Sequence, residues 1–472
     1  MPEARSKICG SIEEAVRRSG LADGDTISFH HHFREGDKVL LPVVAELARL
    51  GYRDLTLASS SLAECHSGLI QYIEQGVITR IYSSGMRGEL AERISRGLLA
   101  EPIQIHSHGG RTALIQSGEL HLNVAFLGVP ACDAMGNANG QTGNACCGSL
   151  GYAQVDAAHA DCVVLVTQEV VGFPNLPASI AADQVDLVVT VDSVGDPNRI
   201  AIGATRMTRN PRDLLIAKRA ADVLAGSGLF ENGFSVQSGT GAASIATIKF
   251  LRDRMEQAGI RARWGLGGIS AAMVELHEAG LVDQLVDTQT FDLRAIEDLR
   301  SNPHHHEISA AQYANPNGKG AYVDRLDLVI LSALEIDLGF NVNVITGSDG
   351  VMRGASGGHC DTAHGAKLAV VTAPLLRART ATVVEKVTTT VTPGADIGVL
   401  VTDAGIAVNP NRPELHERLR EHGLPLVSIE ELLQRSIDIA GVPRPPAVGD
   451  KVVGVIRYRD GTVIDRVHEV VG

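Results

Sequence analysis

A glycine-rich stretch in the second half of the chain, residues 341–361, holds residue types that could do chemistry. Gly347, Gly354 and Gly357 are among five glycines that fall within a dozen positions there. Glycine at that density is unfavourable in a helix or strand, so the stretch is expected to be a loop. Its bare backbone N–H groups, with Arg353 and Asn343 interleaved, could hold an anion or a developing oxyanion. A wide structural turn is the alternative.

Four arginines lie in Gly- or His-rich loops rather than on predicted helix faces: Arg34, Arg111, Arg206 and Arg353. A single loop arginine more often belongs to a surface ion pair, but four in comparable loops favour a shared role. A guanidinium can grip a carboxylate through two parallel hydrogen bonds. The pattern therefore favours a small polycarboxylate as substrate.

The run His30-His31-His32 suggests a metal cluster at first sight. Successive residues of a strand point to opposite faces, so only His30 and His32 could converge. No carboxylate or cysteine stands at a matching spacing nearby, as a zinc site would need. We therefore predict no metal site here. We expect His30 and His32, together with Arg34, to line a polar substrate site.

Glycines also mark the ends of other predicted strands. The Gly239-Thr240-Gly241 segment precedes a predicted helix and resembles half of a dinucleotide fingerprint, but Ser244 stands where the third glycine belongs. A close backbone approach to a phosphate or thioester is favoured over NAD binding. The chain has no GxxxxGK[ST] and no GxSxG, which argues against a nucleotide hydrolase and a serine hydrolase. The substrate-binding candidates in these and later loops are Gly239, Gly241, Gly267, Gly268 and Lys319.

Hydrophobic patterning supplies the elements that would position these loops. Near-continuous apolar runs at residues 162–167 and 186–191 are typical of buried parallel strands. Residues 210–224 predict a helix, with Pro211 in its first turn. Alternation of such strands and helices predicts an α/β protein with mostly parallel sheets.

The two halves of the chain echo each other. A strand–loop–helix–strand order at residues 25–54 recurs at residues 234–261, and residues 123–128 resemble residues 343–347. The repeat predicts two α/β domains of the same type, divided as residues 1–227 and 228–472. Ligands bind at the carboxyl ends of the strands in such sheets. The loops of the two domains are therefore expected to face one cleft.

Composition limits the classes of partner and compartment. The net charge is −13, which argues against nucleic acid, because that ligand requires a basic face. Hydrophobic residues make up 44% of the chain, yet no apolar run approaches the length of a membrane helix, so no membrane partner is expected. The seven cysteines include no C-x-x-C pair, and the first ten residues do not read as a signal peptide. We expect a cytoplasmic protein.

Several motifs together resemble one known family. They are FHHHFREGD (29–37), SHGGR (107–111), NVAFLGVP (123–130), GNANG (136–140), SGTGAAS (238–244), ANPNGKGA (314–321) and NVNVITGSDGVMRGASGGH (341–359). In this order they resemble the citrate lyase alpha-chain family. The resemblance implies two tandem Rossmann-like, CoA-transferase-type domains. It also implies exchange of acetyl for citryl on the thiol of an acyl carrier chain, through a ternary complex and a mixed anhydride.

The same resemblance implies roles for individual residues. Gly357 and Gly358 match the Gly-Gly of the CoA-transferase oxyanion loop, and Gly239 and Gly241 match the first glycine loop of its second half. Many CoA-transferases carry a nucleophilic Glu at a strand end that aligns near Ile269, where this chain has none. Glu35 and Glu231 stay open as alternative nucleophiles. The candidate catalytic residues are Gly357, Gly358, Arg353 and Asn343.

The family likeness also implies ligands and partners. The expected partners are citrate and the beta and gamma (acyl carrier) chains of citrate lyase, with this chain itself a homo-oligomer in the complex. No cofactor is expected on this chain, which would act on the phosphoribosyl-dephospho-CoA thioester of the carrier or on CoA thioesters. The alternatives are a citramalate lyase alpha-type transferase, a stand-alone CoA-transferase or acyl-CoA hydrolase, and a non-catalytic scaffold.

Overall fold

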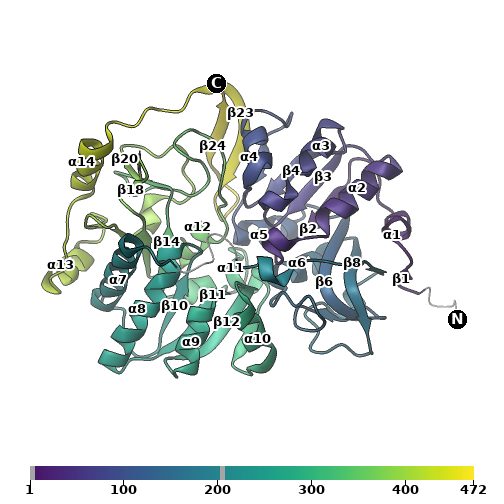
Figure 1. Cartoon of the computed structure of the whole chain (residues 1–472), viewed down its shortest axis with the longest axis horizontal. Helices are drawn as coiled ribbons and strands as arrows, with labels where there is room; N and C mark the ends of the chain where they lie inside the picture. Colours follow the sequence, from purple (N-terminus) through teal and green to yellow (C-terminus); the bar gives the residue numbers. More distant parts are fainter. Residues whose placement is uncertain (1–5, 202–207, 472) are drawn as a thin grey trace.

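Two mostly parallel β-sheets dominate the chain, one in each half (Figure 1). The computed structural model describes residues 6–201 and 208–471. We call residues 6–201 the first half and residues 208–440 the second half. The sheet of the first half has 11 strands, and two of these come from the C-terminal hairpin described below. In spatial order they are β1 (Ile8–Cys9), β9 (Leu187–Thr190), β8 (Cys162–Val171), β6 (Val124–Asp133), β2 (Thr26–Phe29), β3 (Leu55–Ser59), β4 (Ile78–Ser83), β5 (Ile103–Ile105), β23 (Val448–Arg457) and β24 (Val463–Val470), with β7 (Ala138–Asn139) beside β6.

The sheet of the second half has eight strands, parallel except at one edge. In spatial order they are β13 (His305–Glu307), β12 (Val282–Thr290), β11 (Ala262–Ile269), β10 (Phe234–Ser238), β14 (Leu328–Ser332), β17 (Leu368–Thr372), β21 (Val399–Val401) and β22 (Ile406–Val408). Two small sheets complete the half. They contain β16 (Val342–Asn343), β15 (Glu335–Asp337) and β20 (Val383–Val384), and β18 (Leu376–Arg377) with β19 (Thr380–Ala381).

Helices connect and cover these strands. In the first half they are α1 (Ile12–Ser19), α2 (Leu40–Leu50), α3 (Leu69–Glu74), α4 (Gly88–Ser95), α5 (His108–Ser117) and α6 (Gly151–His159). In the second half they are α7 (Pro211–Gly226), α8 (Ala242–Ala258), α9 (Ala271–Glu278), α10 (Leu293–Ser301), α11 (Ala310–Ala314), α12 (His359–Gly365), α13 (Pro413–Glu421) and α14 (Ile429–Ala440). Every residue of β6 is buried, as expected of a parallel strand covered on both faces. The predicted α/β class with mostly parallel sheets is confirmed.

Local signals explain where the helices that border the site begin. Asn210 caps α7, accepting a hydrogen bond from the Arg212 N–H at 2.9 Å, as the Asn-Pro start of that helix predicts. Ser107 caps α5 in the same way, accepting from the Gly110 N–H at 2.9 Å. Helix α8 starts at Gly241 without a side-chain cap, so its first N–H groups are not bonded by a capping side chain.

The internal repeat is partly reproduced in space. The unit β2–α2–β3 and the unit β10–α8–β11 each pair two parallel strands across a helix, as predicted. The second correspondence, residues 123–128 with 343–347, is wrong. The partner of β2 is β6, whereas the partner of β10 is β14, and residues 342–343 form a short strand of a different sheet. The glycines of that stretch, which resemble the end of β6, follow no strand of the main sheet.

The C-terminal hairpin, β23 and β24, returns to the first half. Strand β23 runs parallel to β5, with Val455 opposite Gln104, and β24 pairs antiparallel beside it. Figure 1 shows the hairpin in yellow next to α4, away from α13 and α14, which precede it in the chain. The division into domains at residues 227 and 228 stays a prediction. The first sheet recruits strands from the far end of the chain.

The glycine-rich loop of the second half is bonded to the first half through its backbone. Met86 N–H donates to the Gly354 carbonyl at 3.1 Å, and Ser356 N–H donates to the Ser84 carbonyl at 2.7 Å. His108 N–H, at the start of α5, donates to the Gly357 carbonyl at 2.9 Å. The loop is therefore held from both sides of the boundary between the halves.

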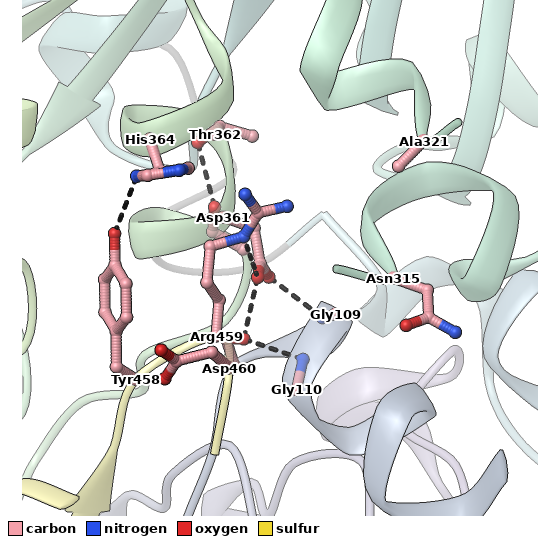
Figure 2. A network of polar contacts seen from close by, with 12 residues as sticks. Gly109, Gly110, Asn315, Ala321, Asp361, Thr362, His364, Tyr458, Arg459 and Asp460 are labelled. Carbon is pink, nitrogen blue, oxygen red and sulfur yellow. Dashed lines mark hydrogen bonds and ion pairs between the residues drawn. The ribbon is translucent and has the colours of Figure 1, made fainter. Parts of the chain in front are cut away.

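A buried carboxylate continues this attachment one turn further on (Figure 2). Asp361 in α12 accepts hydrogen bonds from Ser107 Oγ at 2.8 Å and Gly109 N at 2.9 Å, both from the first half. Arg459, in the turn of the C-terminal hairpin, lies 3.9 Å from the same carboxylate. Its neighbour Tyr458 reaches His364 of α12 at 3.0 Å. Three parts of the chain therefore meet at α12.

Asp361 makes the stability of the chain depend on pH. Burial raises the pKa of this carboxyl to about 6, although the bonds from Gly109 and Ser107 and the nearby Arg459 lower it. The unfolded chain has a carboxyl pKa near 4, so between pH 4 and 6 the folded form binds more protons here and loses stability as pH rises. Relative to Asp361→Asn, the unsubstituted protein should be about 1 kcal/mol more stable at pH 5 than at pH 7.

Urea unfolding at both pH values measures this difference. Asp460→Asn is the control, because Asp460 is exposed and hydrogen bonds from Thr462 lower its pKa, so it should contribute no difference in stability between pH 5 and 7. Parallel pH profiles for the unsubstituted protein and Asp361→Asn would contradict the assignment.

Candidate functional site

A cavity of about 650 Å³ lies between the two halves, at the carboxyl ends of their strands. Its walls include His31 and Arg34 after β2, the Gly239–Gly241 segment after β10, and Ser332 at the end of β14. The glycine-rich loop adds residues 353–359. The predicted placement of both glycine loops in one shared cleft is therefore observed in the structure.

Two consecutive glycines on the cavity wall, Gly357 and Gly358, have free backbone N–H donors. Among residues 6–201 and 208–471, no hydrogen bond from the N–H of Gly357 or of Gly358 is found. In a trans peptide the C=O and the next N–H point in opposite directions. Because the Gly357 carbonyl is held by His108, the N–H of Gly358 is turned the other way. Such aimed donors are what an oxyanion requires.

The site requires glycine at both positions, for different reasons. Gly357 has a φ of +52°, which side chains other than glycine rarely adopt. A Cβ on Gly358 would lie 2.6 Å from the hydroxyl oxygen of Tyr313. Tyr313 in turn accepts a hydrogen bond from Gln237 Nε2 at 2.8 Å, so the loop packs closely against a buried polar pair. A side chain at either position would displace the donors.

The cavity wall is cationic although the chain as a whole carries a net charge of −13. Five arginines line it, against one acidic side chain, Asp213, among the described residues. The arginines are Arg34, Arg87, Arg212, Arg353 and Arg377. A local excess of positive charge in a confined space favours an anionic ligand.

Arg34 differs from the other arginines of the wall because it is half-buried and has no counter-ion, whereas the others are exposed. In the described part of the chain its guanidinium makes no ion pair or hydrogen bond, and its Nε is buried without a partner. Its backbone has a φ of +51°, a region that costs energy for any residue except glycine. Burial lowers the pKa of Arg34 to about 10, which still leaves it protonated at neutral pH. A half-buried cation without a counter-ion is stabilised by an anionic ligand.

Neutral aromatic side chains from the first half form one part of the wall. His31 and His108 stack with ring centres 5.7 Å apart, and Tyr152 packs against both. Burial lowers the pKa of His108 to about 3, and burial likewise holds the pKa of His31 well below its usual value. These imidazoles are therefore uncharged at neutral pH. They offer hydrogen bonds rather than charge.

Several polar atoms on the wall have no partner among the described residues. They are His108 Nδ1, Gln237 Oε1, Thr288 Oγ1 and Ser356 Oγ. Buried polar groups in proteins nearly always find a hydrogen-bond partner. A ligand that carries both carboxylate groups and a hydroxyl group would satisfy both types here, because a carboxylate only accepts hydrogen bonds whereas a hydroxyl also donates.

Four predicted site residues lie behind the wall rather than on it. Asn343 is fully buried and holds the loop by bonds to Glu335 and to residues 345–346. His30 and His32 do converge, with ring centres 6.1 Å apart, but neither lines the cavity. Arg111 is bound to Asp156 by both terminal nitrogens, at 2.6 and 2.7 Å.

The remaining candidates divide in the same way. Gly239, Gly241, Gly268 and Arg353 line the cavity, and Arg353 is ion-paired with Asp349. Gly267 lies outside the wall, where a Cβ would meet the Gln237 amide at 2.6 Å. Lys319 and Glu231 are exposed away from the cavity. Glu35 accepts hydrogen bonds from the N–H groups of Glu64 and Cys65, and Arg206 lies outside the described residues.

Sequence reasoning missed several residues of the wall. His31 and His108 stand inside motifs that were singled out, but their neighbours were preferred. Arg87, Gln237, Phe291 and Tyr313 carry no local pattern that sets them apart, and only the fold brings them together. In the described residues no group of three or more His, Cys, Asp or Glu side chains could hold a metal, and no helix there is long and apolar enough to cross a membrane.

The chain matches one protein family along nearly its whole length. The family described as citrate lyase, alpha subunit (CitF), matches residues 5–470. A citrate lyase alpha chain of Escherichia coli K12 is 61% identical over 464 residues, which cover 98% of this chain and 91% of that protein. The citrate lyase alpha chain of Klebsiella pneumoniae is 62% identical with the same coverage.

Solved structures give the same result. A crystal structure described as the alpha subunit of citrate lyase from Streptococcus mutans in complex with citrate has a TM-score of 0.97 at 50% identity, covering 100% of this chain and 92% of that one. The alpha subunit of a malonate decarboxylase from Acinetobacter baumannii has a TM-score of 0.67 at 17% identity, covering 94% and 96%. The second likeness shows the fold alone.

The structure predicts that Arg111 supports the site from behind. Replacing Arg111 by Met would leave the carboxylate of Asp156 buried without an ion-pair partner. The neighbouring His30 cannot take the place of Arg111, because burial lowers the pKa of His30 to about 3 and keeps it neutral. We expect Arg111→Met to lower the free energy of unfolding by about 3 kcal/mol. Urea unfolding measures it, with Arg80→Met as control, because Arg80 pairs with Asp54 at the surface. Equal losses in the two variants would show that the buried pair has no special weight.

Proposed function

Because the chain belongs to the citrate lyase alpha-subunit family, we propose that it is the transferase subunit of a citrate lyase. It exchanges acetyl for citryl on the thiol of an acyl carrier chain, so that acetyl carrier and citrate give citryl carrier and acetate. One observation carries the proposal. The free N–H groups of Gly357 and Gly358 and the unpaired guanidinium of Arg34 border the same cavity.

The reaction divides into two acyl transfers. A citrate carboxylate attacks the carbonyl carbon of the acetyl thioester, and the oxyanion that forms accepts hydrogen bonds from the diglycine N–H groups. Collapse of this intermediate breaks the C–S bond and releases the carrier thiolate, leaving a mixed anhydride of acetate and citrate. The thiolate then attacks the citryl carbonyl of the anhydride, and acetate leaves. Each oxyanion donor is worth about 3–4 kcal/mol of barrier.

The wall supplies the remaining contacts of citrate. Two carboxylates stay ionised while the third reacts, and Arg34 and Arg87 are cations on the wall to which no ion pair is assigned among the described residues. The neutral rings of His31 and His108 suit the hydroxyl group of citrate, since a neutral imidazole both donates and accepts hydrogen bonds. This arrangement binds a polycarboxylate without neutralising the attacking group.

The wall also favours transfer without an acyl-enzyme. Among the described residues that line the cavity there is no Glu, and Asp213 is engaged by Arg212 at 3.6 Å and by Thr208 at 3.1 Å. A nucleophilic carboxylate would have to be free to attack the thioester. Direct attack by citrate therefore accounts for the residues that are present.

Exposed arginines on the cavity wall are relevant to the proposed partner chains. Arg212 and Arg377 are exposed on the cavity wall, which suits the phosphate groups of a phosphoribosyl-dephospho-CoA arm or of CoA itself. We propose the beta and gamma chains of the lyase as partners, and a homo-oligomeric arrangement of this chain within the complex. The seven cysteines are free thiols, which supports a cytoplasmic location.

The diglycine role predicts a loss of turnover out of proportion to any loss of stability. Gly358→Val pushes against Tyr313 and displaces the loop donors. We expect kcat to fall by about 10²–10³-fold, while the free energy of unfolding falls by about 1–2 kcal/mol. Gly172→Val is the control, because a Cβ there meets nothing within 4 Å. Unchanged kcat in Gly358→Val would remove this loop from the mechanism.

The function is tested by direct transfer. The purified chain is mixed with acetylated carrier chain and citrate, and mass spectrometry follows conversion of the acetyl thioester to the citryl thioester and any label on the protein. We expect citryl carrier, acetate and an unlabelled protein. Acetyl on a carboxylate of the protein would replace the ternary mechanism by an acyl-enzyme. Equal turnover with citramalate, or hydrolysis without citrate, would point to the alternative activities.

A further inference from the structure

Arg34 is held in the cavity by an aromatic ring instead of a carboxylate. Its guanidinium carbon lies over the ring of Phe291, 4.7 Å from the ring centre. Arg34 follows strand β2 of the first half, whereas Phe291 follows strand β12 of the second half, and both line the cavity. The cation and the ring that supports it therefore come from opposite sides of the boundary between the halves.

Packing and a backbone hydrogen bond fix the position of the Phe291 ring. A Cβ on Gly268 would lie 1.9 Å from Cζ of Phe291, so the ring rests directly against the glycine backbone. The Phe291 N–H donates to the Ile269 carbonyl at 2.9 Å, which fixes the backbone from which the ring extends. Only 6% of Phe291 is exposed. The ring of Phe291 therefore packs directly on Gly268, and only glycine leaves enough space for it there.

The type of support matters for binding. A carboxylate would fix an arginine but would also occupy its N–H groups and cancel its charge, as Asp349 does for Arg353. An aromatic face attracts a cation through its quadrupole and leaves the charge in place. The N–H groups of Arg34 make no hydrogen bond within the described residues, so no protein acceptor competes with a ligand for them.

We propose that Phe291 is a positioning residue for the substrate. It holds the guanidinium of Arg34 against the wall with its charge and its donors open to a substrate carboxylate, and Gly268 provides the space for the ring. This inference rests on the proposed function, in which Arg34 binds one of the citrate carboxylates.

Direct binding of citrate to the full chain tests the idea. Isothermal titration compares the unsubstituted protein with Phe291→Leu, which keeps an apolar side chain but removes the ring, and with Phe291→Tyr, which keeps the ring. We expect the Kd for citrate to rise about tenfold in Phe291→Leu and to stay within about twofold in Phe291→Tyr. In the transfer assay, KM for citrate should rise more than kcat falls, and KM for the acetyl thioester should stay unchanged.

A double-mutant cycle separates positioning from general packing. If Phe291 acts through Arg34, then Phe291→Leu should weaken citrate binding no further once Arg34→Gln is present. Phe234→Leu is the matched control, because Phe234 is a buried phenylalanine of the same half that packs on Phe230 and lies outside the cavity wall. It should leave the Kd unchanged.

The possible outcomes distinguish a failure of the proposed function from a failure of the role inferred for Phe291. An unsubstituted protein that does not bind citrate would overturn the proposed function and this inference with it. Citrate binding that is equal in the unsubstituted protein and Phe291→Leu would overturn the inference alone. Losses that add fully in the double variant, or a Phe291→Tyr variant as weak as Phe291→Leu, would also overturn it, since each would show that the ring does not act through the cation.

Discussion

Backbone hydrogen bonds across the boundary between the halves are the constraint on which the site depends. The glycine-rich loop belongs to the second half, yet Ser84, Met86 and His108 of the first half bond its peptide groups. Because one of these bonds holds the Gly357 carbonyl, the direction of the following N–H is set by the first half. The orientation of the Gly358 N–H therefore depends on contacts from both halves of the chain.

Two arginines near the cavity, Arg111 and Arg34, have different roles because their surroundings differ. Both arginines belong to the first half: Arg111 is buried in helix α5, where the sequence predicted a loop, and Arg34 is half-buried beyond the end of β2. Arg111 forms an ion pair with Asp156. Burial alone would raise the pKa of Asp156, but Arg111 and His30 lower it below its usual range. Arg34 has only an aromatic face beside it. What surrounds each guanidinium decides whether it stabilises the fold or stays open to a ligand.

The sequence predicts the scaffold well because the signals for it are local. Apolar runs predict β8 and β9, and the Asn-Pro pair predicts the start of α7. Site residues are harder, because long-range partners select them. No residue close to Arg111 in the sequence indicates that it forms an ion pair with Asp156, which lies 45 residues further along the chain. At the His run, β2 ends at Phe29 and the chain turns, so His31 reaches the cavity while its neighbours pair behind it.

The C-terminal hairpin has a consequence for biosynthesis. Strand β5 receives its neighbour β23 only after nearly the whole chain between them has been made. The nascent first half therefore leaves the ribosome with one sheet edge unpaired, and such an edge invites wrong partners. Contacts between distant segments also slow folding, since a long loop must close before they form. For this chain, the time between synthesis of β5 and arrival of the hairpin is the interval in which misassembly and help from chaperones would matter most.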